Sequence, residues 1–472
     1  MLLLCTVKHK FKIMKKFNGA YIFGISMISA MGGLLFGYDW VVIGGAKPFY
    51  ERFFDIAGSA NYQAWAMSSA LIGCVVGAVV SGIVSDRFGR KWPLLFSAFL
   101  FTIASLGTGL ASSYTVFIIF RMIGGVGIGL ASALSPMYIA EVSPSHLRGR
   151  FVSLNQMTIV IGILAAQVIN LLIADKVPVG ASDAFIQASW NGQIGWRWMF
   201  YACAVPASLF FILAFFLPES PRWLMKAGKA EKAFPTLKKI GGEDYAREEM
   251  KNIQATLDDV GEKVDFKALF SPRFRSVLVI GVVLAVFQQW CGINTVFNYA
   301  EEIFTAAGYG VSDTLFNIVI TGSVNLVFTL VAMFTVDKWG RKKLMLFGSI
   351  GLAINYVLLG GAFFMGVQGI TVLSLVVVAI GIYAMSLAPV LWVVLSEIFP
   401  NRIRGAAMAL ATFALWIACF ILTFTFPLLN KSLGAAGTFW VYAGICLLGF
   451  IFILKKLPET KGKSLEEIEK II

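Results

Sequence analysis

The stretch SDRFGRKWPLL, residues 85–95, occurs twice in this chain, the second time as VDKWGRKKLML at residues 336–346. Another stretch, AEVSPSHLRGR at residues 140–150, returns as SEIFPNRIRGA at residues 396–406. The glycine in each DRFGRK-like stretch permits a tight turn between two helices. Two motifs that recur in the same order predict a chain built from two similar halves.

Long apolar segments lie around these turns. Of the 472 residues, 58% are hydrophobic and only 14% charged, whereas soluble proteins carry roughly 25% charged residues. A helix of ~20 apolar residues spans the hydrocarbon layer, where it satisfies its own backbone hydrogen bonds. The segments are too long for the strands of a β-barrel. We therefore expect an all-α membrane protein. The twelve transmembrane helices, in two six-helix bundles, are predicted at residues 20–44, 63–84, 92–112, 114–140, 151–174, 197–217, 276–298, 314–336, 344–366, 370–395, 405–429 and 436–454.

The lysines and arginines predict the orientation, because they accumulate in cytoplasmic segments. With both termini placed inside, 33 of the 39 basic residues fall in cytoplasmic segments. The outer loops then hold only Lys47, Arg52, Lys176 and Lys431. The sequence therefore predicts cytoplasmic N- and C-termini.

The same pattern predicts five regions. A cytoplasmic N-terminal segment (1–19) precedes the first six-helix bundle (20–217), and a cytoplasmic linker with short helices follows (218–275). The second six-helix bundle (276–454) and a cytoplasmic tail (455–472) complete the chain. The linker is too short and too polar to form a second catalytic domain.

Several classes of function are disfavoured. The net charge of +13 is spread between apolar segments, which argues against nucleic-acid binding. The six cysteines show no paired spacing, so we expect neither a disulfide framework nor a metal site. The sequence contains no GxxxxGK[ST] motif and no Ser/His/Asp arrangement, so we expect neither an ATP-driven pump nor an enzyme, and no cofactor.

Acidic and basic residues recur at fixed places in the two pairs of cytoplasmic motifs. Acidic residues contribute little to the orientation signal, so we expect opposite charges to form a breakable clamp on the cytoplasmic side. The alternative is that the charges only hold the loops inside. The candidate clamp residues are Asp86, Arg90, Glu141, Arg148, Asp337, Arg341, Glu397 and Arg404.

One carboxylate, Asp39, lies inside the first predicted span, in LLFGYDWVVIGGA at residues 34–46. A charge in hydrocarbon is costly and usually functional. Arg121 is the one unpaired basic residue within a predicted span, so it is the natural partner of Asp39. The alternative is a static ion pair that only orients two helices.

Taken together, nine motifs in order resemble the sugar porter family of the major facilitator superfamily, and within it the bacterial D-xylose/proton symporters. The likeness extends from about residue 20 to residue 470. It implies two six-helix bundles that give alternating access to a sugar, and a proton-coupling role for Asp39 with Arg121. The motifs are GYD (37–39), DRFGRK (86–91), RMIGGVGIG (121–129), PMYIAEVSPSHLRG (136–149), PESPRWL (218–224), QQWCGIN (288–294), DKWGRKK (337–343), SEIFPNRIRG (396–405) and PETKGKSLEEIE (458–469).

A sugar site needs uncharged amides for the hydroxyls and aromatic rings for the C–H faces. Such side chains occur within the apolar segments, where the alternative is that amides tie helix to helix. Gly292, beside Asn294, is expected to let the seventh span unwind at the substrate. The resemblance favours sugar contact for the amides of QQWCGIN and for Gln156, Asn325 and Trp392, and it adds Phe36 as an aromatic of the same site. The candidate sugar-binding residues are Gln156, Gln288, Gln289, Asn294, Asn325, Trp392, Trp416 and Phe36.

Three positions depart from the family pattern. Leu415 replaces a usual amide, Asn298 replaces the first of two usual tyrosines, and Ile163 replaces a glutamine of the xylose symporters. The pocket therefore has fewer hydrogen-bonding groups than those of the family, and the identity of the sugar is open. We expect D-xylose first and D-glucose or another aldose second.

The expected function is proton-coupled monosaccharide symport across a cell membrane, with a bacterial inner membrane as the expected location. A facilitative sugar uniporter is the first alternative, and a sugar sensor that does not transport is the second. The expected partners are the monosaccharide, protons and the lipid bilayer. One chain contains the whole pathway, so we expect a functional monomer.

Overall fold

The computed structural model describes residues 17–145, 147–259, 270–400 and 403–461. This part of the chain is helical and contains no strand. We call six long helices with two short segments the first half: α2 (Gly19–Phe53), α3 (Ala60–Phe88), α4 (Lys91–Leu110), α5 (Tyr114–Val142), α6 (Arg148–Ile173), α7 (Asp183–Ala188), the π-helix η1 (Asn191–Gly195) and α8 (Trp196–Ala214). The second half comprises α12 (Pro272–Trp290), α13 (Ile293–Asn298), α14 (Ala300–Ala306), α15 (Val311–Trp339), α16 (Arg341–Phe364), α17 (Ile370–Met385), α18 (Leu387–Ile398) and α19 (Arg404–Lys456).

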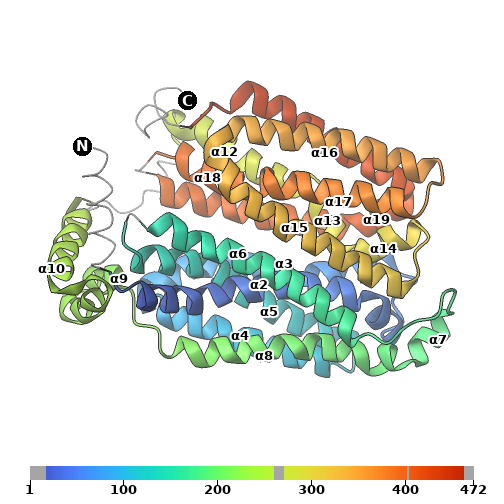
Figure 1. Ribbon diagram of the computed structural model, residues 1–472, viewed down its shortest axis with the longest axis horizontal. Helices are drawn as coiled ribbons and strands as arrows, with labels where there is room; N and C mark the ends of the chain where they lie inside the picture. Colours follow the sequence, from blue (N-terminus) through green and yellow to red (C-terminus); the bar gives the residue numbers. More distant parts are fainter. Residues whose placement is uncertain (1–16, 146, 260–269, 401–402, 462–472) are drawn as a thin grey trace, which may run out of the picture.

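The two halves lie side by side, with their long helices roughly parallel (Figure 1). Within the first half α3 packs on α5 and α2 on α6, and within the second half α16 packs on α19. Across the boundary α3 packs on α19, and α15 packs on α6. The linker helices α9 (Pro221–Lys226) and α10 (Ala230–Asp259) lie at one end of the molecule, and α7 and α14 lie towards the opposite end (Figure 1).

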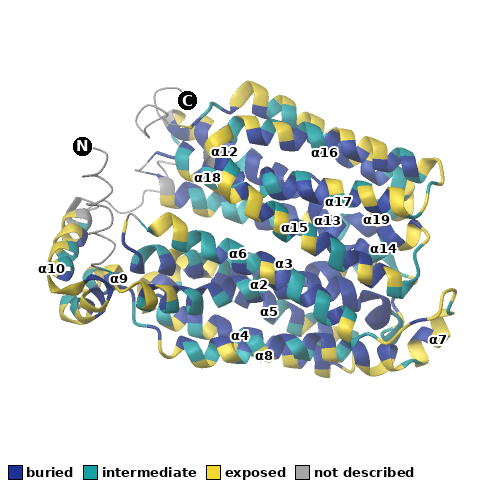
Figure 2. Ribbon diagram, viewed as in Figure 1, coloured by how far each residue is buried: buried dark blue, intermediate teal, exposed yellow. Residues whose placement is uncertain are grey.

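The long helices have the length and hydropathy of membrane spans. Within the described residues, eleven helical segments meet this criterion, and one of them covers almost all of α19. Gly434 interrupts α19 with a non-helical backbone (φ 67°, ψ 176°), so α19 supplies two spans and the total reaches the expected twelve. Large apolar side chains such as Leu172, Phe216 and Phe334 are more than 70% exposed. Figure 2 shows exposed residues along the outer surfaces of the helices, where lipid would cover apolar side chains.

Glycines let α5 approach α3 closely at the level of the site. A Cβ atom on Gly73 of α3 would collide with the backbone of Met122, and one on Gly125 of α5 would collide with the backbone of Ala70. The two helices therefore touch along their backbones. This close contact fixes α5, and with it Arg121, one turn before Gly125.

The first helix is longer than the sequence predicts. Lys47 and Arg52 were expected in an outer loop, but both lie within α2, which continues to Phe53. That expectation is wrong because Lys47 is not in water: it is 1% exposed and lies among the carboxylates of Glu51, Glu301 and Glu302. A charge that is surrounded by opposite charges does not need to end a helix.

The seventh span breaks where Gly292 predicts it. Helix α12 ends at Trp290, α13 begins at Ile293, and Gly292 between them has a φ of 87° in the left-handed region. This confirms the expected unwinding. It also places the amides before and after the break on two different helices, with Gln289 near the end of α12 and Asn294 in the short α13, and the two side chains are hydrogen-bonded.

We expect Gly292→Ala to lower the stability of the protein. The left-handed conformation costs a residue with a Cβ about 1–2 kcal/mol, and the added Cβ would lie 2.8 Å from the ring of Tyr442. Thermal unfolding of the purified protein in detergent measures the effect. Gly444→Ala is the matched control, because a Cβ there meets no atom within 4 Å. Equal melting temperatures for the two variants would contradict the expectation.

Candidate functional site

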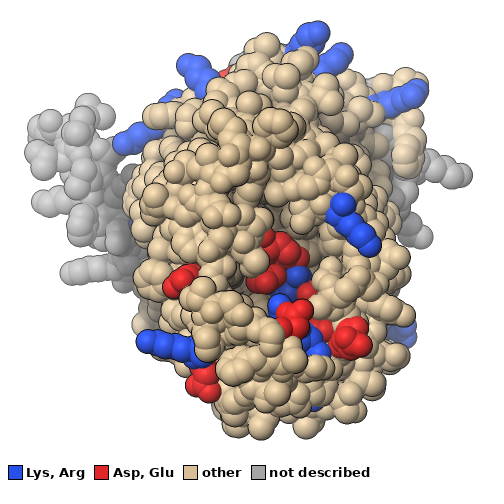
Figure 3. Space-filling model, turned by 90° about the vertical axis from the view of Figure 1, so that its right-hand side faces the viewer, with Lys and Arg blue, Asp and Glu red and all other residues tan. Residues whose placement is uncertain are grey.

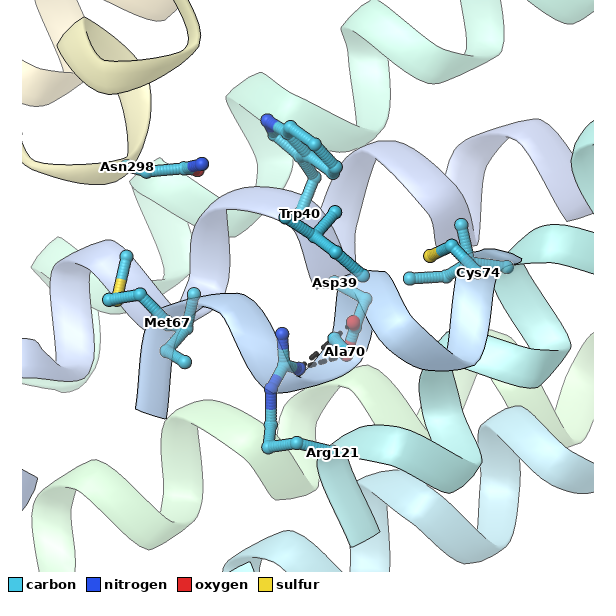
Figure 4. A pocket seen from close by; sticks show the side chains of 10 residues that line it. Asp39, Trp40, Met67, Ala70, Cys74, Arg121 and Asn298 are labelled. Carbon is cyan, nitrogen blue, oxygen red and sulfur yellow. Dashed lines mark hydrogen bonds and ion pairs between the residues drawn. The ribbon is translucent and has the colours of Figure 1, made fainter. Parts of the chain in front are cut away.

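Asp39 of α2 and Arg121 of α5 form a buried ion pair. Arg121 Nη1 donates to both carboxylate oxygens of Asp39, at 2.8 and 2.9 Å. Asp39 is 5% exposed and Arg121 is 3% exposed. Figure 4 shows the two side chains pointing toward one another from their helices. The expected partnership of these two residues is therefore present in the structure.

A small pocket lies beside this pair. Its lining comes mainly from α2, α3 and α5, and includes Trp40, Met67 and Cys74. The second half contributes Asn298, whose side chain extends toward the pocket from α13 (Figure 4). Asn298 Oδ1 is buried and has no hydrogen-bond partner among the described residues. The pocket beside the ion pair thus includes one polar side chain of the other half.

The amides around the break in the seventh span form one hydrogen-bonded network. Gln288 Nε2 donates to the hydroxyl of Tyr383 on α17, and Gln289 Nε2 donates to Gln288 Oε1 at 2.6 Å. Asn294 Nδ2 donates to Gln289 Oε1 and lies 3.8 Å from Cys419 Sγ. All three amide residues are less than 9% exposed. Their donors and acceptors are exchangeable for those of a hydroxylated ligand at little net cost.

Aromatic rings from both halves meet near the pocket. The centroid of Phe36 lies 5.8 Å from those of Trp40 and Trp416, and Trp40 and Trp416 are 6.2 Å apart. Phe36 and Trp40 belong to α2, whereas Trp416 belongs to α19. Such a group offers apolar faces to a sugar ring.

The remaining candidates are less tightly connected. Asn325 of α15 is buried, Gln156 of α6 is partly buried, and Trp392 of α18 is 39% exposed. Among the described residues, no hydrogen bond or ring contact joins these three side chains to the amide network. Of the positions that depart from the family pattern, Leu415 and Ile163 are buried apolar residues.

The SDRFGRK motif of the first half forms a compact charge cluster with residues of α5 and of the segment before α9. Arg90 donates from Nε and Nη2 to the two oxygens of Glu141, both at 2.9 Å. Ser220 Oγ donates to Glu141 Oε2 at 2.6 Å, and Glu219 Oε1 accepts the backbone N–H of Arg90 at 2.7 Å. The cluster joins the start of α4 to α5 and to the segment before α9.

The second half repeats this cluster. Arg341 Nη2 donates to Glu397 Oε1 at 3.0 Å, and Thr460 Oγ1 donates to Glu397 Oε2 at 2.5 Å. Glu459 Oε1 accepts the backbone N–H of Arg341 at 3.0 Å. The similarity of PES (218–220) and PET (458–460) is therefore structural: each supplies one carboxylate and one hydroxyl to the same place in its half.

Other candidate clamp residues have different partners. Asp86 Oδ1 lies 3.0 Å from Lys226 Nζ, and Arg148 Nε donates to the backbone carbonyl eight residues before it. The side chains of Asp337 and Arg404 lie outside the described ones. In the described part of the chain, no ion pair at this end joins the two halves, so a clamp between them stays a prediction.

Sequence reasoning missed four residues of this arrangement. Trp40 directly follows Asp39 in a run of apolar residues, and its ring was the available signal. Tyr383 lies in the tenth span, and its hydroxyl, a polar group in an apolar segment, was the available sign of a polar contact. Glu219 and Glu459 could have been found from the PES and PET similarity.

The fold and the site define a membrane transporter in which polar groups lie between two similar halves. The profile of the family described as "Sugar (and other) transporter" matches residues 25–472. The chain belongs to this family and has the major facilitator fold.

Several relatives of this chain align with it over nearly its whole length. The D-xylose-proton symporter of Escherichia coli strain K12 is 40% identical, over 97% of this chain and 96% of its own. The arabinose-proton symporter of Bacillus subtilis strain 168 is also 40% identical, over 96% of this chain and 95% of its own. The inward open conformation of the xylose transporter XylE from E. coli superposes with a TM-score of 0.83 at 39% identity, covering 96% of this chain and all of that one.

Proposed function

We propose that this chain is a proton-coupled symporter of a monosaccharide that works by alternating access. The observation that carries the proposal is the buried pair of Asp39 and Arg121 beside a pocket that reaches Asn298 of the second half. A buried carboxylate held by one guanidinium can exist in two states, paired and ionised or protonated and released. The relatives whose names state proton symport support this reading.

The proposed cycle uses these two states. From the outside Asp39 takes up a proton and releases Arg121, sugar binds to the amide network, and the halves rock. On the inside the higher pH removes the proton, and Asp39 pairs with Arg121 again. The membrane potential assists each inward charge by about 2.3 kcal/mol per 100 mV.

The proposed sugar is D-xylose first, with D-glucose or another aldose second. The names of the xylose and arabinose symporters support a pentose. Leu415 and Ile163 supply no hydrogen bonds, so the site relies on Gln288, Gln289 and Asn294. Gln156, Asn325, Trp392, Trp416 and Phe36 complete the proposed set of contacts.

The proposed setting is a bacterial inner membrane, with both termini cytoplasmic and the protein active as a monomer. The basic residues of the linker support this orientation. In it, the end with α9 and α10 is cytoplasmic, and the end with α7 and α14 is outer (Figure 1). The proposed bundles are residues 20–217 and 276–454.

The function is tested by a pH trace from unbuffered, energy-depleted cells that express the chain. We expect the medium to become alkaline when D-xylose is added, because each sugar enters with a proton. Cells without the chain are the control. Sugar uptake without a pH change would identify a facilitative uniporter, and binding without uptake would identify a sensor.

A further inference from the structure

Four charged residues form a second buried cluster that the proposed cycle does not use. Lys47 Nζ lies 3.2 Å from Glu51 Oε1, 3.4 Å from Glu301 Oε2 and 2.5 Å from Glu302 Oε1. The side chain of Lys47 is 2% exposed and that of Glu51 is 5% exposed. We call these residues the Lys47 cluster. Gln63 Nε2 donates to Glu51 Oε2 at 3.1 Å and ties α3 to it.

The Lys47 cluster connects the two halves. Lys47 and Glu51 belong to α2, whereas Glu301 and Glu302 belong to α14. Of the ion pairs that the structure describes, those of Lys47 with Glu301 and Glu302 are the ones that cross from one half to the other. The pair of Arg52 and Asp183, one turn further along α2, stays within the first half.

The position of the cluster suits contacts that are made and broken. It lies at the end of the molecule opposite the linker helices, where α2 meets α14. Acidic and basic side chains gather there in the middle of the face, which is hollowed at this point (Figure 3). Glu301 and Glu302 are 13% and 22% exposed, so water reaches the rim of the cluster but not Lys47.

The contact between α2 and α14 in this cluster depends on the positive charge of Lys47. Three carboxylates surround one ammonium group, so the lysine is the sole charge that offsets their repulsion within the cluster. A buried ion pair is weak evidence for stability, but removing one partner leaves uncompensated charge and is strongly unfavourable. Water can relieve that charge if α14 moves away from α2.

We infer that the Lys47 cluster is an ion-pair lock that holds this end of the transporter closed. Lys47, Glu301 and Glu302 are positioning residues: they do not touch the proposed sugar or proton site but set the distance between the halves. The lock is closed in this structure, which resembles an inward open transporter. In the proposed orientation, opening the lock is the step that admits sugar from outside, so the inference rests on the proposed function for its role in transport.

The lock is tested without measuring transport. Ile43 lies one turn from Lys47 on α2, lines the pocket and is 1% exposed, so a cysteine there reacts with a bulky maleimide only when this end opens. We measure the labelling rate of Ile43→Cys in the purified full chain in detergent. Adding Lys47→Met is expected to raise the rate by about tenfold or more, because three carboxylates then face one another.

Two further variants separate a lock from a general loss of structure. The exchange of charges, Lys47→Glu with Glu302→Lys, keeps the composition of the cluster and is expected to restore slow labelling. Glu301→Gln with Glu302→Gln removes the contact without leaving repulsion, so its rate is expected to lie between those of the parent and Lys47→Met. Arg52→Met is the matched control, and its rate is expected to equal that of the parent.

Parent-like labelling of Lys47→Met would overturn the lock, and so would fast labelling of a folded charge-exchange variant. Monodispersity on size exclusion shows that each variant is folded. Because labelling needs neither sugar nor a proton gradient, its result is independent of the pH trace. A failed lock leaves the proposed symport standing, and a failed symport leaves the lock as a feature of an uncoupled carrier.

Discussion

Asp39→Asn is expected to abolish sugar accumulation while sugar exchange across the membrane continues. A single proton driven by 100 mV supplies about 2.3 kcal/mol, which sustains roughly 50-fold accumulation of a neutral sugar. Asparagine cannot bind or release a proton in this range. The accumulation ratio should therefore fall to about one.

Exchange should survive because asparagine keeps the shape of the residue and one acceptor for Arg121. Breaking a buried pair is expensive, so exchange of labelled for unlabelled sugar also reports that the variant is folded. Asp183→Asn is the matched control: it changes an ion-paired aspartate of the first half that lies outside the site. If Asp39→Asn still concentrates sugar, the pair is static, and its only role is to orient α2 and α5.

Gln288→Ala is expected to weaken sugar binding by about 5- to 150-fold, because a buried group left without its partner costs about 1–3 kcal/mol. Gln288 is central to the amide network: it donates to Tyr383 and accepts from Gln289. Its loss removes a proposed sugar contact and leaves Gln289 without an acceptor. Isothermal titration of the purified protein with D-xylose measures the change.

Two controls interpret this result. Tyr383→Phe removes only the hydroxyl that orients Gln288, so we expect a smaller loss of affinity. Asn355→Ala removes another buried amide of the second half that lies outside the proposed site, and it should leave binding unchanged. If Gln288→Ala binds sugar as the parent does, the amides serve helix packing, as buried amides in membranes often do.

The features that depend on local pattern were predictable from the sequence. Two copies of a motif predict two similar halves, and Gly292 predicts the break in the seventh span. Asp39 and Arg121 could be paired by elimination, since each is the isolated charge of its segment. For the ion pair, the cost of burying a charged residue in hydrocarbon leaves few alternatives to pairing it with the opposite charge.

The features that depend on distant residues were not predictable. Lys47 looked like the end of a helix because its neutralising partners on α14 lie about 250 residues away in the sequence. The ring of Trp40 became part of a cluster only when Trp416 of α19 was placed beside it. The direction of each amide depends on packing, so Tyr383 could not be matched to Gln288 from spacing alone.

The paired clusters of Arg90 with Glu141 and of Arg341 with Glu397 have a consequence for energetics. Each cluster joins the ends of helices within one half, so its bonds would be kept if the halves rock as rigid bodies. A contribution common to both conformers cancels from the equilibrium constant between them. Substitutions in these clusters should therefore reduce the yield of folded protein. The equilibrium between the two conformations depends instead on contacts that exist in only one of them.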